Sequence, residues 1–161
     1  RDLMLMGYDQ AVDDNTTLDI FWGLYEIMGV SLVDMRMWQW LYAHPDATAQ
    51  QLREATLAIA KEVWNTYYYP VLGEQDSPIL ACYSHMVNAP MYLPNYPFGH
   101  IVEFQLEEHL AQFPTKQAFA DEIMRIYKLG KLTPNQWMQQ AVGAKVSTTP
   151  ILNAVEAILK K

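Results

Sequence analysis

The sequence predicts an all-α protein, built as a compact array of about seven helices. Apolar residues recur at three- and four-residue steps over most of the 161 residues, which is the spacing of the buried face of a helix. No stretch shows the sustained alternation of polar and apolar residues between turn signals that is typical of strands. We therefore expect a single all-helical domain over residues 1–161.

The first expected helix follows an acidic loop over residues 8–16, which contains a helix-start signal. An apolar stripe then runs to about Tyr42. His44 precedes a proline and is therefore disfavoured in the helical conformation, so we expect the helix to end before it. The stripe consists of Phe21, Trp22, Tyr25, Met28, Gly29, Leu32 and Met35.

The second expected helix begins at a capping-box pattern. The Thr48 hydroxyl can accept a hydrogen bond from an unpaired amide of the first turn, and Gln51 can return one to the backbone of Thr48. An apolar stripe follows, and we expect the helix to end near Tyr67. A loop over residues 73–78 then leads to a short apolar segment over residues 79–87, which we expect to be helical.

The segment over residues 88–97 is rich in proline. Pro90 and Pro97 can each open a helix, because proline suits the first helical turn. Pro94 lies between them and predicts a kink or a break. From there, residues 98–113 return to the helical pattern of apolar positions.

Three further helices are predicted at the C-terminal end. Thr115 follows a proline and can cap the first of them, which Gly130 closes. Thr133 precedes a proline and, three residues on, a glutamine, and this helix ends at Gly143. Thr149, again followed by proline, opens the last helix.

Composition argues against several classes of partner. The formal net charge is -7, so the protein repels nucleic acids and anionic membranes on average. No apolar run approaches the roughly 20 residues of a membrane-spanning helix. Cys82 is the single cysteine and can form neither an internal disulfide nor a cysteine-based zinc site. The sequence begins at Arg1 with no visible signal peptide, and we expect it to be part of a longer polypeptide; nothing in it indicates a compartment.

Several catalytic motifs are absent from the sequence. There is neither a glycine-rich phosphate loop nor a G-x-S-x-G elbow. The motif H-E-x-x-H, which presents two histidines and a general base to zinc from one helix, is also absent. None of the four histidines is followed by glutamate: His44, His85, His100 and His109.

The most unusual segment runs from Tyr83 to His100. It places His85 seven and eleven positions before Tyr92 and Tyr96, with prolines constraining the backbone between them. Histidine and tyrosine both donate hydrogen bonds, and donors that converge on one oxygen would stabilise the tetrahedral oxyanion of acyl transfer. The alternative is that the two tyrosines bury their rings in the core and keep their hydroxyls at the surface.

The stretch from His85 to Leu110 resembles the C-terminal signature of two families of gluzincin zinc peptidases. These are the oligopeptidases (thimet oligopeptidase and oligoendopeptidase) and the angiotensin-converting-enzyme family. The aromatic, glutamine-containing helix over residues 98–106 and the closing stretch 143–158 look like the corresponding helices of the families. The resemblance covers residues 75–161 well and residues 1–74 loosely.

In these families a histidine and a pair of tyrosines face the catalytic zinc, bind the substrate carbonyl and stabilise the oxyanion. The matching positions are His85, Tyr92 and Tyr96. The resemblance thus implies the C-terminal helical part of a zinc peptidase that hydrolyses peptide substrates, with zinc ligands upstream of Arg1. Glu26 fits the family's third-ligand motif superficially, but it lies closer to the histidine than the family spacing allows. We expect the isolated chain to bind no zinc tightly and to lack peptidase activity.

Two alternatives belong to other classes. In the first, the protein is a non-enzymatic helical domain whose aromatic segment 83–98 binds a partner peptide or helix. In the second, His100, Glu103 and Glu107 bind a metal, because positions i, i+3 and i+7 share one face of a helix. A solvated polar face also explains these three residues.

Overall fold

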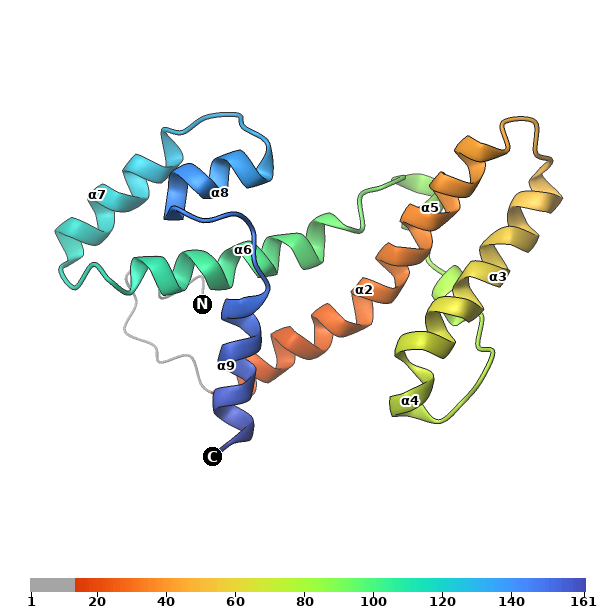
Figure 1. Ribbon diagram of the computed structural model, residues 1–161, viewed down its shortest axis with the longest axis horizontal. Coiled ribbons are helices and arrows are strands. Elements are labelled where there is room, and N and C mark those ends of the chain that lie inside the picture. Colours follow the sequence, from red (N-terminus) through yellow and green to blue (C-terminus); the bar gives the residue numbers. More distant parts are fainter. Residues whose placement is uncertain (1–13) are drawn as a thin grey trace. The chain divides into compact units, whose positions relative to one another are not determined.

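The computed structural model describes residues 14–161, and within this range it contains helices and no strand (Figure 1). The predicted all-α class is therefore confirmed. The part of the acidic loop expected over residues 8–13 lies outside the described residues. The elements are α2 (Asp14–Ala43), α3 (Ala49–Tyr67), α4 (Tyr69–Leu72), the 3-10 helix η1 (Ile79–Ala81), α5 (His85–Asn88), α6 (Asn95–Leu110), α7 (Lys116–Tyr127), α8 (Pro134–Val142) and α9 (Thr149–Leu159).

The chain divides into two compact units. The central unit comprises residues 23–97, and the terminal unit comprises the described residues 14–22 and 98–161. Helices α2 and α6 each run without interruption through a boundary between the units. The candidate residues His85, Tyr92 and Tyr96 all belong to the central unit.

The first two helices form where the sequence predicts, but the buried face of α2 differs from the predicted stripe: Trp22 and Met28 are exposed, and the buried apolar side chains are those of Leu24, Val30, Val33 and Met37. Helix α2 ends at Ala43, just before the His44-Pro45 pair. Helix α3 begins with the expected capping box: Gln51 N donates to Thr48 Oγ1 at 3.3 Å, and Thr48 N donates to Gln51 Oε1 at 2.9 Å. These two bonds satisfy amides that a helix N-terminus otherwise leaves unpaired, so the start of α3 is fixed locally.

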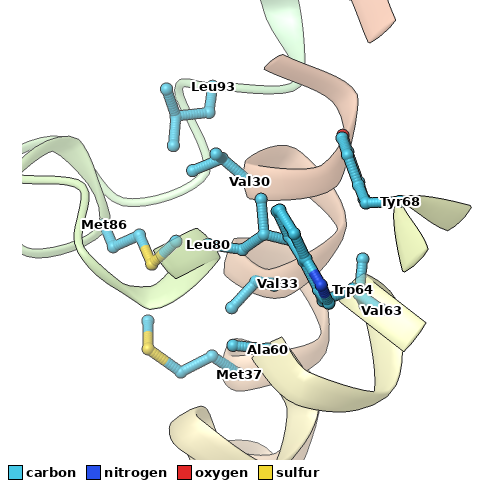
Figure 2. Close-up of a cluster of buried hydrophobic side chains, with 10 residues drawn as sticks. All are labelled: Val30, Val33, Met37, Ala60, Val63, Trp64, Tyr68, Leu80, Met86 and Leu93. Carbon is cyan, nitrogen blue, oxygen red and sulfur yellow. The ribbon is translucent and has the colours of Figure 1, made fainter. Parts of the chain in front are cut away.

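The core of the central unit lies between α2, α3 and the segment that follows them (Figure 2). Helix α2 contributes an apolar stripe, and α3 supplies the facing side chains. The later elements add Leu80 from η1, Met86 from α5 and Leu93, which is fully buried. Because Met86 and Leu93 lie in the same core, they anchor the segment between them to α2 and α3. The remaining members are Val30, Val33, Met37, Ala60, Val63, Trp64 and Tyr68.

Gly29 permits a close contact between α2 and the residue that follows α3. The Tyr68 hydroxyl accepts a hydrogen bond from Gly29 N at 2.8 Å and donates one to Tyr25 O at 2.5 Å. A Cβ atom at position 29 would overlap the Tyr68 ring. Glycine is unfavourable inside a helix, but here it allows a buried tyrosine to reach the helix backbone.

The structure corrects two expectations for the segment between α4 and α6. Residues 79–87 do not form one helix, because η1 and α5 are separated at residues 82–84. Leu80 and Met86 are both buried in the central core, and positions six apart would face different sides of a continuous helix. Pro90 opens no helix either, because the next residue, Met91, has a left-handed φ of 60°. Pro97 does lie in the first turn of α6.

The terminal unit has a separate core around Leu110, Ile126 and Ala141, which come from α6, α7 and α8. Helix α8 starts with the capping box predicted at Thr133 and ends at Gly143, whose φ is 80°. The start of α7 is also the predicted one, since its cap is Thr115. The C-terminal elements thus follow the local signals of the sequence.

Candidate functional site

The structure brings the three candidate residues together in one row of rings. The ring centroids of His85 and Tyr92 lie 6.1 Å apart with an interplanar angle of 14°, and those of Tyr92 and Tyr96 lie 5.3 Å apart, edge to face. Tyr83 continues the row, with its ring centroid 5.2 Å from that of His85. We call these four residues the aromatic row. Tyr83 was not among the sequence candidates, although it lies two positions before His85.

The tyrosines of the row are accessible from outside the protein. The exposed fractions of Tyr83, Tyr92 and Tyr96 are 40%, 46% and 44%. Neighbouring rings of the row contact one another, and the buried core residues of this segment are Met86 and Leu93. The row is therefore a surface on which a ligand could lie, held in place by buried neighbours in the sequence.

The hydroxyl groups of the row interact with one another. The pKa of Tyr96 is raised above its ordinary value, first by a hydrogen bond with the Tyr92 side chain and then by burial and by the nearby Tyr92 and Tyr83 hydroxyls. A raised pKa favours the protonated form, so Tyr96 stays a donor at neutral pH. The two hydroxyls therefore lie close together, with the Tyr96 O–H donating to the Tyr92 oxygen.

His85 has an unusual feature for a partly exposed histidine. Its Nδ1 atom is buried and, among the described residues, has no hydrogen-bond partner. Most buried polar side-chain atoms in native proteins are paired, so such an atom requires an explanation. A histidine placed for a ligand is one explanation, because the ring is then oriented by packing rather than by its own hydrogen bonds.

A buried carboxylate lies beneath the same segment, and the sequence interpretation missed it. Asp34 on α2 is fully buried, and its Oδ2 atom accepts a hydrogen bond from Met91 N at 3.0 Å. Burial raises its pKa, and the Met91 amide and the Trp38 side chain lower it by less. Asp34 Oδ1 and Trp38 Nε1 are both buried without an aligned partner, so the indole acts on the carboxylate mainly as a nearby dipole. The sequence did contain a signal for this residue, because Asp34 stands between the apolar residues Val33 and Met35.

The polar face of α6 that the sequence suggested as a metal site holds a local pair of side chains, His100 and Glu103. His100 Nδ1 lies 3.0 Å from Glu103 Oε2, which makes a local ion pair on α6 when the histidine is protonated. Across residues 14–161, no three His, Cys, Asp or Glu side chains lie close enough together to hold a metal ion. Glu26 on α2 is accordingly not a member of any such group.

A second buried acid lies in the terminal unit and was also missed. Glu122 on α7 accepts hydrogen bonds from Arg125 Nε at 2.8 Å and Arg125 Nη2 at 2.5 Å, and its Oε1 lies 2.7 Å from His109 Nε2. These partners, Arg125 above all, lower the pKa of Glu122 to about 2. Arg125 also donates to the carbonyls of Gln140 and Ala141 at the end of α8. The cluster ties α6, α7 and α8 together, so we assign it to the fold rather than to the site.

Comparison with known proteins adds no relative. No family model matches the chain, and neither a curated protein nor a solved structure is similar enough to count as a match. Within the part of the chain that the structure describes, no helix has the length and apolar character needed to cross a membrane.

Proposed function

We propose that the aromatic row is the substrate-binding and oxyanion-stabilising side of a peptidase active site, in a zinc-dependent protein that hydrolyses peptide bonds. The observation that carries this proposal is that His85, Tyr92 and Tyr96 form one row of neighbouring rings in which both tyrosines are exposed. The zinc ligands and the general base belong to a part of the polypeptide outside the described residues. The role of this chain is to bind and orient the substrate and to donate hydrogen bonds.

The chemistry asked of the row is donation to a carbonyl oxygen whose negative charge grows during the reaction. Donors aimed at the developing oxyanion lower the barrier, because their hydrogen bonds strengthen as the tetrahedral intermediate forms. Tyr92 suits this role because its hydroxyl accepts a hydrogen bond from Tyr96, and accepting a bond makes its own O–H a stronger donor. His85 lies against the ring of Tyr92 and would add a second donor.

The first test concerns the natural polypeptide that contains this sequence. An in-frame H-E-x-x-H upstream of Arg1, followed by a glutamate-bearing helix, would support the peptidase proposal. A natural polypeptide without this motif would contradict it.

The second test is kinetic and uses that complete polypeptide. We expect His85→Ala, Tyr92→Phe and Tyr96→Phe each to lower kcat by about 10²–10³-fold, with little effect on the fold. The matched control is Tyr127→Phe, which removes a hydroxyl from a tyrosine that is 75% exposed and lies in the terminal unit. Unchanged turnover in all three site variants would contradict the proposed roles.

A second candidate function is supported by the exposed apolar side chains beside the row. Val87 is 81% exposed and Met91 is 46% exposed, and both lie between His85 and Tyr92 in the sequence. Together with the tyrosines they would suit a non-enzymatic surface for an extended peptide or a helix. Saturable binding of peptides with no hydrolysis, in a polypeptide that lacks H-E-x-x-H, would favour this function over the peptidase.

A further inference from the structure

The aromatic row is attached to the rest of the central unit at a point where the backbone is strained. Met91, directly before Tyr92, has a φ of 60°, a left-handed conformation that residues other than glycine rarely adopt. Such conformations persist only where the surroundings hold them, and they cluster at functional sites. The local turn supplies one bond, from Tyr92 N to Ala89 O at 3.1 Å. In a second bond, Met91 N donates to the carboxylate of Asp34, which lies fifty-seven residues earlier in the chain.

An aspartate at position 34 lowers the stability of the fold, because its carboxylate is buried. A fully buried carboxylate loses its hydration, and it is tolerated only where hydrogen bonds or charges replace the water. Here the replacement is incomplete: one aligned amide, from Met91, and one misaligned indole, from Trp38. An apolar side chain would satisfy the neighbouring core of Val33 and Met37 at lower cost. The carboxylate is therefore explained better by what it holds than by the stability it adds.

The hydrogen bond from the Met91 amide to Asp34 fixes the backbone next to Tyr92 relative to α2. Leu93, two residues further on, is fully buried in the same core as Val30 and Val33 of α2 (Figure 2). Tyr92 thus lies between an apolar anchor on one side and the Asp34 hydrogen bond on the other. Two anchors on flanking residues fix both the location and the direction of a side chain.

We propose that Asp34 is a positioning residue: its carboxylate holds the Met91 peptide in the left-handed conformation and thereby aims Tyr92, and with it the rest of the aromatic row, at the substrate. The effect on catalysis rests on the proposed peptidase function. The effect on the geometry of the row does not, because it concerns contacts within the central unit alone. The two parts are therefore tested by separate measurements.

The structural test uses the 161-residue chain. We expect Asp34→Leu, which removes the acceptor, to speed hydrogen exchange of the Met91 amide by about 10- to 100-fold and to shift the ring resonances of Tyr92 and Tyr96. Asp34→Asn keeps an acceptor oxygen and should leave both signals close to those of the wild type. The matched control is Ser31→Ala, which removes a buried hydroxyl from α2 that donates within its own helix, to Ile27 O at 2.8 Å.

A measurement on the wild type keeps the inference testable if Asp34→Leu does not fold. A through-hydrogen-bond NMR coupling between the Met91 amide nitrogen and the Asp34 carboxylate carbon is expected. Absence of that coupling would overturn the inference, and so would an Asp34→Leu chain in which the Met91 amide and the tyrosine rings are unchanged. Neither outcome depends on whether the protein is a peptidase.

The catalytic test uses the complete polypeptide. We expect Asp34→Leu to lower kcat by about 10²-fold with a smaller change in KM, because a misdirected donor fails mainly in the transition state. Asp34→Asn should restore most of this loss, and Ser31→Ala should show none. A wild type that has no peptidase activity but passes the NMR tests would refute the proposed function and leave the positioning of the row intact. Equal losses in Asp34→Asn and Asp34→Leu would overturn positioning by a hydrogen-bond acceptor.

Discussion

Among residues 14–161, each unit buries one carboxylate, and the two carboxylates have opposite surroundings. Glu122, in the terminal unit, faces Arg125 and His109, and its pKa is lowered to about 2. Asp34, in the central unit, forms no ion pair with any residue from 14 to 161, and burial raises its pKa. The first carboxylate is compensated by charge, so it stabilises the structure. The second is compensated by one amide and a dipole, so its presence beneath the aromatic row points to a role other than stability.

We expect the largest effect on stability when the charge of Glu122 is removed. We expect Glu122→Gln to lower the free energy of unfolding by about 2–3 kcal/mol, because the amide cannot replace two charge-assisted hydrogen bonds to Arg125. The loss is smaller than for a fully buried pair since Arg125 is 44% exposed. Urea unfolding of the 161-residue chain measures it.

The matched control is Glu156→Gln on α9. Glu156 also pairs with a cation, Lys160, at 2.8 Å, but both side chains are well exposed. Exposed pairs contribute about 0.5 kcal/mol or less. If Glu122→Gln and Glu156→Gln cost the same, burial does not distinguish the two pairs, and the assignment of the Glu122 cluster to the fold would be wrong.

The next expected effect is a difference in acid sensitivity. The folded-state pKa of Glu122 is lowered from 4.5 to about 2, so its stabilising contribution is present above pH 4.5 and is lost as the pH falls toward 2. Asp34 has the opposite sign: its raised pKa contributes stability below its ordinary value of 3.8, and that contribution is lost as the pH rises through the folded-state pKa. The two groups therefore offset each other in the wild type on acidification.

Variants separate the two contributions. Between pH 6 and pH 3, Glu122→Gln should lose about 2 kcal/mol less stability than the wild type, because the sensitive group is gone. Asp34→Asn should lose more than the wild type, because it lacks the group that gains from acid. Urea unfolding at several pH values gives these slopes. Parallel curves for the wild type and both variants would mean that neither carboxylate changes its pKa on folding.

The sequence predicts the helix boundaries of the terminal unit better than those of the central unit. The helices of the terminal unit start and end at local signals, such as Thr133 and Gly143, and a capping pattern needs only a few consecutive residues. In the central unit, the break at residues 82–84 follows from which side chains enter the core, and no glycine or proline marks it. The left-handed Met91 is equally hidden, because that conformation usually belongs to glycine or asparagine.

The candidate site was only partly predictable for the same reason. The spacing of His85, Tyr92 and Tyr96 on one proline-rich segment suggested that they act together, and their rings do contact one another. The bond from Met91 to Asp34 joins residues far apart in the sequence, and no local pattern predicts such a pairing. The carboxylate inside an apolar stripe was a signal that something must compensate it, but not what.

The smallest expected effect concerns Asp34, whose carboxylate is compensated by one amide and a dipole but by no cation. At pH 7, we expect Asp34→Asn to change the free energy of unfolding by less than about 1 kcal/mol, because two contributions nearly cancel. The variant removes a buried charge, which is favourable, but its amide N–H group replaces Oδ1 at a point with no aligned partner, which is unfavourable. Urea unfolding beside Glu122→Gln gives the comparison directly. A loss as large as that of Glu122→Gln would mean that the charge of Asp34 is compensated after all, and that it belongs to the fold in the way that Glu122 does. A near-zero change in the free energy of unfolding of Asp34→Asn, together with shifted ring resonances of Tyr92 and Tyr96 in Asp34→Leu, would show that Asp34 positions the row without stabilising the fold.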